Sequence, residues 1–110
     1  MATEDPLRGC SGFEWDEGNA AKIRERHGVL WWECEQAFFL QPFLVAEDGK
    51  HSQKETRYFC LGRTEAGRLL FMVFTIRGER IRVISARPMS RRERRAYESA
   101  KAKPEESEEG

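Results

Sequence analysis

Several features that define common protein classes are absent from this 110-residue chain. The longest apolar run covers residues 69–74, whereas a membrane-spanning helix needs about 20 apolar residues. The three cysteines lack metal-ligand spacing, and the chain contains no Walker A loop, GxGxxG motif, CxxC pair or RNP signature. The acidic N-terminus also differs from a secretory signal. We therefore expect a cytoplasmic protein with reduced thiols that uses no membrane, metal ion or organic cofactor.

Lysine is absent from a long stretch of the C-terminal half. Between Arg57 and Arg95 all 11 basic residues are arginine, and the acidic residues there are Glu65, Glu79 and Glu93. Arginine can bind phosphate or carboxylate through two parallel hydrogen bonds, whereas lysine acts as a point charge. This bias predicts a cationic surface for an anionic partner such as RNA or an acidic protein. The alternative is a solvated basic surface that serves only solubility.

Composition divides the chain into three parts. Residues 1–12 are small, polar and turn-rich, and residues 101–110 carry four glutamates and a proline. Neither segment can bury enough apolar area to offset its ordering entropy, so we predict a flexible N-terminal segment and an acidic disordered tail. Residues 13–100 then form one small domain with 16 basic and 13 acidic residues, a net charge of +3.

Helix signals follow the first aromatic residues. Asp16 is a favourable N-cap residue, and Gly28 is a favourable residue just past a helix end, so we predict a helix that runs to about His27. A second helix covers about residues 30–40, because its apolar residues recur at helical spacing and Pro42 follows. These two helices precede most of the strand signals.

Strand signals dominate the second half of the chain. Short apolar or alternating runs predict strands at residues 13–15, 43–48, 56–64, 68–77 and 80–87. Ser90 and Glu93 form the S-x-x-E pattern of a capping box, so a last helix starts near Arg91 and ends near Lys101. We expect an α+β domain, with two N-terminal helices packed on a mostly antiparallel sheet of four to five strands and a C-terminal helix.

Three arginines lie in or at the end of predicted strands, where a rigid sheet can orient them. Arg57, Arg77 and Arg87 could converge on one phosphate and stabilise its transition state. In the last strand, simple alternation places Arg87 on the same face as Ile81 and Val83. The alternative is that these arginines extend into solvent or pair with glutamates.

Two other side chains could transfer protons. His27 ends the first predicted helix, where it is either a C-terminal cap or a proton-transfer residue. Glu55 lies two residues before Arg57 and shares its predicted sheet face, so it is either a general base or the salt-bridge partner of Arg57. His51 lies in a polar loop, and the sequence gives no reason to assign it a role.

The last predicted helix begins with an unfavourable charge pattern. A helix N-terminus carries about half a positive charge, so cations in the first turns are slightly destabilising. An anion bound there would contact free amide groups and arginines together. The alternative is a solvated helix face. The arginines concerned are Arg91, Arg92, Arg94 and Arg95.

Two long segments resemble the BrnT family. FEWDEGNAAKIRERHGV at residues 13–29 is similar to the family's opening F-x-W-D and its helix ending in Lys/Arg-His-Gly-Val. Residues 57–98 are similar to the rest, with strands ending in Leu-Gly, Thr-x-Arg and Ile-Ser-Ala-Arg before an arginine-rich helix ending in Tyr-Glu. The resemblance spans about residues 12–99. The chain differs at Arg26, where the family usually has lysine, and at Trp32, an additional aromatic residue.

The resemblance implies a RelE-like fold and a toxin of a type II toxin–antitoxin pair. Such toxins act as endoribonucleases, similar to mRNA interferases, that inhibit translation. For RNA the substrate's 2′-OH can attack the adjacent phosphate and leave a cyclic phosphate without a metal ion. The predicted catalytic residues are His27, Glu55, Arg57, Arg77 and Arg87. The predicted RNA- and phosphate-binding residues are Arg26, Arg82, Arg91, Arg92 and Arg95.

The resemblance also implies partners. A cognate ribbon-helix-helix antitoxin, similar to BrnA, would bind the toxin, and the complex would contact operator DNA only through the antitoxin. A dimer of the toxin could form within that complex. The alternative function is a non-catalytic module that binds RNA or the antitoxin and acts mainly within the operon repressor complex.

Overall fold

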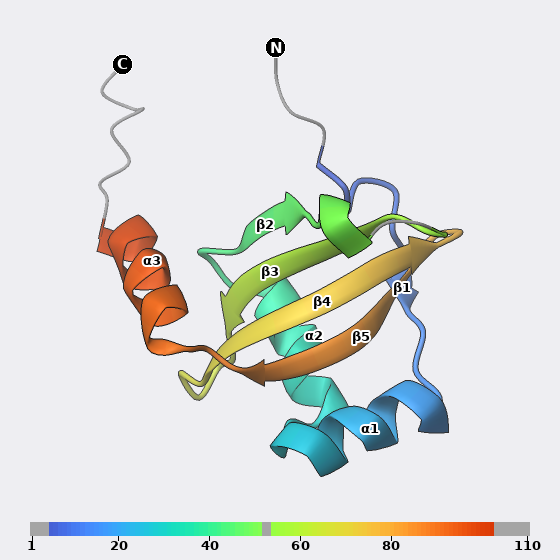
Figure 1. The fold of residues 1–110 in the computed structure, drawn as a ribbon, viewed down its shortest axis with the longest axis horizontal. Coiled ribbons are helices and arrows are strands. Elements are labelled where there is room, and N and C mark those ends of the chain that lie inside the picture. The colour runs from blue at the N-terminus through green and yellow to red at the C-terminus, as the bar shows by residue number, and fades with distance from the viewer. Residues whose placement is uncertain (1–4, 52–53, 103–110) are drawn as a thin grey trace.

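A five-stranded sheet with the strand order β1-β5-β4-β3-β2 is the centre of the structure (Figure 1). This computed structural model describes residues 5–51 and 54–102. All neighbouring strands are antiparallel except β1 and β5, which pair in parallel. The elements are β1 (Gly12–Phe13), α1 (Glu17–His27), α2 (Trp31–Phe39), β2 (Leu44–Glu47), the 3-10 turn η1 (Gly49–His51), β3 (Arg57–Arg63), β4 (Leu69–Arg77), β5 (Arg80–Pro88) and α3 (Arg91–Ala102). The predicted α+β class is confirmed.

Local capping signals account for the limits of α1. The Asp16 side chain accepts a hydrogen bond from the Asn19 amide, and the Asn19 side chain accepts one from the Asp16 amide. Gly28 has a φ of 66° and closes the helix by donating to the Arg24 carbonyl. The Asn19 amide group also donates to the Val83 carbonyl at 3.0 Å, which attaches the start of α1 to β5. The predicted caps are confirmed.

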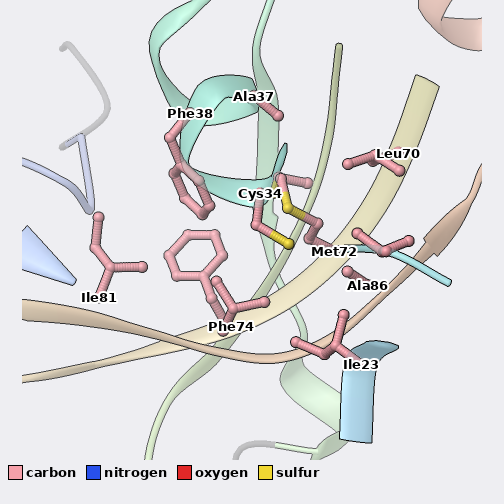
Figure 2. Packing of buried hydrophobic residues seen from close by; sticks show 12 residues of the cluster. Ile23, Cys34, Ala37, Phe38, Leu70, Met72, Phe74, Ile81 and Ala86 are labelled. Atoms are coloured by element: carbon pink, nitrogen blue, oxygen red, sulfur yellow. The ribbon is translucent and has the colours of Figure 1, made fainter. Parts of the chain in front are cut away.

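The core lies between the sheet and the two N-terminal helices (Figures 1 and 2). Phe38 of α2 packs edge-on against Phe74 of β4, with ring centroids 5.1 Å apart. Ile23 of α1 is buried in the same cluster. Cys34 is also buried, and burial raises the pKa of its thiol to about 12, so the thiol stays protonated at neutral pH. The three cysteines are free thiols, as predicted.

A register shift in β5 changes which residues face the core. Phe74 pairs with Val83, but its neighbour Val73 pairs with Ser85, so β5 holds one extra residue at Ile84. Val83 and Ala86 are both buried, although strict alternation would place them on opposite faces. The predicted common face for Arg87, Ile81 and Val83 is therefore wrong, because the bulge turns Arg87 to the other side.

The opposite face of the sheet is not covered by an α-helix in the described part of the chain (Figure 1). In this view α2 lies behind the sheet, α1 lies below it along the β5 edge, and α3 stands beside one end of it. The Tyr97 hydroxyl of α3 donates to the Pro42 carbonyl at 2.7 Å, and this contact fixes the helix there. We call the uncovered side the open face. Register places on it the side chains of Arg57, Phe59, Phe71, Val73, Arg77 and Arg87.

Part of the predicted flexible N-terminal segment is packed against the domain. Leu7 and Cys10 contact the core, and β1 begins at Gly12, one residue before the predicted domain boundary. At the other end α3 includes Lys101 and Ala102, which were assigned to the tail. Residues 1–4 and 103–110 lie outside the described residues, so the division into segments stays a prediction. No helix among residues 5–51 and 54–102 has the length and apolarity to cross a membrane.

Candidate functional site

Charged side chains gather where β3 begins, β4 ends and β5 begins. Thr75 of β4 pairs with Arg57 on one side and with Arg82 on the other. Cross-strand neighbours lie about 5 Å apart, so these two arginines flank one position of the sheet. Arg77 follows two residues later on the same face, and Glu55 precedes β3. We call Glu55, Arg57, Arg77 and Arg82 the arginine–carboxylate cluster.

Glu55 and Arg77 form a two-point pair within this cluster. Arg77 Nε donates to one Glu55 oxygen at 3.3 Å, and Arg77 Nη2 donates to the other at 3.2 Å. The hydrogen bonds from Arg77, helped by the charge of Arg57, lower the pKa of Glu55. The carboxylate is therefore ionised at neutral pH. The sequence suggested Arg57 as the partner of Glu55, whereas the ion pair in the structure joins Glu55 to Arg77.

Arg82 is held by carboxylates from the other side. Its guanidinium donates to both oxygens of Asp16, at 3.0 and 3.3 Å, and lies 3.7 Å from Glu14. The hydrogen bond from Arg82 lowers the pKa of Asp16, which also caps α1. The cap thus attaches the start of α1 to the cluster, because one carboxylate serves both contacts.

A cavity of about 360 Å³ opens beside the cluster. Glu55 and Arg57 line it together with Lys50, His51 and Lys54 from the preceding connection. His51 Nδ1 lies 2.9 Å from an Asp48 oxygen, which orients the ring. The sequence gave His51 no role. Its placement depends on where η1 lies relative to the start of β3, and no local motif encodes that position.

Arg87 lies at the other end of β5. It donates twice to Glu93, at 2.8 and 2.9 Å, and its guanidinium carbon lies 4.1 Å from the centre of the Phe71 ring. Arg87 pairs with Phe71 and Arg57 pairs with Thr75, four positions further along β4, which is about 13 Å along an extended strand. Arg57, Arg77 and Arg87 therefore do not converge on one phosphate. The alternative of pairing with glutamates holds for Arg77 and Arg87.

His27 lies in the helix layer, away from the cluster. Its neighbour Gly28 accepts a hydrogen bond from Arg68 at 3.1 Å, and Arg68 directly precedes β4. This places His27 near the end of the sheet opposite to Glu55. His27 and Arg26 are both exposed, and among the described residues neither makes a hydrogen bond or ion pair with the cluster. Their predicted roles stay predictions.

The arginine-rich start of α3 follows Arg87 directly. The predicted capping box is present, because the Glu93 amide donates to Ser90 Oγ and the Ser90 amide donates to Glu93 Oε1. The four arginines of the first turns are exposed. Their charges therefore lie at the end of the sheet opposite to the cluster.

Comparisons with known proteins identify a family and a similar solved structure. Residues 15–93 match the family model described as the ribonuclease toxin BrnT of type II toxin–antitoxin systems. The crystal structure of the Brucella abortus ribonuclease toxin BrnT has a similar fold, with a TM-score of 0.51 and 19% identity over 73% of this chain and 97% of that chain. At this identity the second match shows a shared fold alone. No curated protein sequence matches the chain.

Proposed function

This chain belongs to the BrnT family of ribonuclease toxins of type II toxin–antitoxin systems, and we propose that it cleaves RNA at the arginine–carboxylate cluster without a metal ion. One observation carries the choice of site. Glu55, an ionised carboxylate, is held by Arg77 beside Arg57 at the open face and lines a cavity with His51. A carboxylate, two arginines and a histidine thus lie close together, and this arrangement supports the choice of site.

The chemistry needs no group beyond the RNA and these side chains. Glu55 accepts the proton of a 2′-OH, whose oxygen attacks the adjacent phosphorus. Arg57 and Arg77 bind the non-bridging oxygens and stabilise the charge of the pentacoordinate transition state. His51 donates a proton to the departing 5′-oxygen. The products are a 2′,3′-cyclic phosphate and a 5′-hydroxyl.

His27 and Arg26 are competing candidates, because the family resemblance predicts roles for them. Their position in the helix layer separates them from Glu55, so we assign the acid role to His51. Replacing each histidine by glutamine distinguishes the two assignments. We expect His51→Gln to slow cleavage by about 100-fold or more, in the range of general acid catalysis, and His27→Gln to leave the rate nearly unchanged.

The test of the function is cleavage of single-stranded RNA in EDTA, with analysis of the new ends. We expect fragments with cyclic phosphate ends, and we expect them to disappear with Glu55→Gln and with Arg77→Ala. Arg24→Ala, which removes an exposed arginine from α1, is the matched control and should cleave normally. Cleavage that requires a divalent cation, or that survives Glu55→Gln, would refute the proposed mechanism.

The lowered pKa of Glu55 favours a second candidate function, because a lowered pKa makes the carboxylate a weaker base. In this candidate the cluster binds RNA, or an acidic segment of the antitoxin, without cleavage. Intact RNA that remains bound in the same assay would support it.

Membership of a type II toxin–antitoxin family implies an antitoxin partner. We propose that this partner is a BrnA-like ribbon-helix-helix protein, which would bring any toxin dimer to DNA, and that both proteins act in the cytoplasm. Copurification of the two proteins encoded side by side would test the pairing. Failure of the chain to bind such a neighbour would contradict it.

A further inference from the structure

An exposed aromatic ring occupies the middle of the open face. Phe59 of β3 keeps 37% of its surface exposed, although residues on either side of it belong to a well-packed strand. Burial of apolar surface stabilises a fold, so the exposed third of this residue contributes nothing to stability. Its partner in β2 is Ala46, a small and exposed residue that leaves the side of the ring toward β2 uncrowded.

The ring belongs to a row that crosses three strands. Phe59 stacks on Phe71 of β4, with centroids 6.1 Å apart and planes inclined by 28°. Arg87 of β5 covers the same Phe71 ring at 4.1 Å, and Glu93 holds Arg87 in place. Phe71 is thus packed between a ring and a guanidinium group. Phe59 is the end of the row, with an exposed ring that is already oriented.

Arginines lie on both sides of this row, along the direction of the strands. The arginine–carboxylate cluster, in which Arg77 and Arg82 are paired with carboxylates, occupies one end of the open face, and the exposed arginines of α3 lie beyond the other. A ligand that crosses the row would place an anionic group beside the α3 arginines and a flat apolar group against Phe59. Single-stranded nucleic acid has this combination, because its phosphates are regularly spaced and its unpaired bases expose their π faces.

We propose that Phe59 is a stacking site for an unpaired base of single-stranded RNA, with the phosphates on one side of that base bound by the exposed α3 arginines. The inference rests on the proposed function for the identity of the ligand, but stacking itself does not require the 2′-OH. A single-stranded oligonucleotide without 2′-hydroxyls therefore binds without being cleaved. Base pairing hides the base face, so a duplex stacks poorly on this ring.

The test uses a short single-stranded 2′-deoxy oligonucleotide that contains 2-aminopurine, whose fluorescence is quenched on stacking. We expect the native protein to bind it with quenching. Phe59→Ala and Phe59→Leu should weaken binding by about 5- to 150-fold, the range for loss of one base–aromatic stack, and abolish the quenching. Phe59→Trp should restore both. Comparing Phe59→Leu with Phe59→Trp distinguishes the contribution of an aromatic ring to binding from that of an apolar side chain of any kind.

Phe39 provides a matched control, because it is a more exposed phenylalanine, at 73%, on α2 behind the sheet. Phe39→Ala should leave binding and quenching unchanged. The proposal is overturned if Phe59→Ala binds with native affinity and quenching, if Phe39→Ala loses as much, or if duplex binds as well as the single strand. Because the probe cannot be cleaved, native binding without any RNA cleavage would refute the proposed function and leave the stacking site standing.

Discussion

At the scale of single residues, the ionisation of Glu55 depends on Arg77. The hydrogen bonds from Arg77 are the largest cause of its lowered pKa. We therefore predict that Arg77→Gln raises the pKa of Glu55 toward the ordinary glutamate range, because the charged form loses its main stabilising contact. A carboxyl-selective NMR titration measures the shift directly.

Arg80 offers the matched control for this titration. It pairs with Arg77 across the β4–β5 turn and carries the same charge, but it makes no hydrogen bond to Glu55. Arg80→Gln should move the pKa of Glu55 much less than Arg77→Gln does. Equal shifts from the two variants would mean that long-range charge, and not the paired hydrogen bonds, sets the ionisation of Glu55.

Gly62 permits α2 to approach the sheet. A Cβ atom at this position would lie 3.0 Å from the Ala37 carbonyl oxygen and 3.2 Å from the Ala37 Cβ, and neither atom can rotate away. We predict that Gly62→Ala lowers the free energy of unfolding by about 1–3 kcal/mol, as overpacking of a core contact does. Gly12→Ala, where the added atom meets nothing within 4 Å, is the control. Urea denaturation that gives equal stabilities would contradict the close contact.

At the scale of elements, one carboxylate joins β5 to α3. Glu93 receives two hydrogen bonds from Arg87 and one from the Ser90 amide, and the bond from Arg87 is the main reason that its pKa is lowered. We predict that Glu93→Gln destabilises the fold by up to about 1 kcal/mol at neutral pH, the usual range for a partly exposed ion pair. Chemical denaturation from pH 7 to pH 3 measures the difference.

The lowered pKa of Glu93 sets the direction in which its contribution to stability changes with pH. Because the folded-state pKa of Glu93 lies below its unfolded value, the stabilisation is complete above the unfolded pKa and disappears as the pH falls through the folded pKa. The difference in the free energy of unfolding between the native protein and Glu93→Gln should therefore disappear at acidic pH. The ion pair of Glu98 with Lys101 is solvent-exposed. Glu98→Gln should therefore differ little from the native protein in its free energy of unfolding at every pH in the series. A difference in the free energy of unfolding that grows at acidic pH would refute the stabilising role of the Glu93–Arg87 ion pair.

Sequence signals predicted those elements whose ends depend on nearby residues. Asp16, Gly28 and the Ser90–Glu93 box act over three or four residues, and the structure has each cap as predicted. The bulge at Ile84 was missed because an extra residue shows only against the partner strand. The site contains a contact of the same long-range kind. Spacing placed Glu55 near Arg57, whereas its partner Arg77 lies 22 residues further along the chain and could not be identified from local sequence.

At the scale of the whole molecule, the two faces of the sheet differ: one is buried against helices and the other is exposed. The core lies on the side of the sheet where α1 and α2 pack (Figure 1). Strand register places the arginine–carboxylate cluster and the aromatic row on the open face. Strand order creates this division, because it places β4 in the centre and brings the ends of β3, β4 and β5 together. Composition revealed the excess of arginine but not the face on which it lies.

The salt dependence of binding can locate the path of the nucleic acid, because each phosphate neutralised on a single strand contributes about 0.7 to the slope of log K against log salt. Arg92 lies at the start of α3, whereas Arg26 lies on α1 in the helix layer, and both are exposed. If the strand crosses the open face, Arg92→Gln lowers the slope by about 0.7 and Arg26→Gln leaves it unchanged. Fluorescence anisotropy with the 2′-deoxy oligonucleotide over a salt series measures both. The reverse result would place the strand along α1 beside His27, and His27 and Arg26 would then replace Glu55 and His51 as the centre of the site.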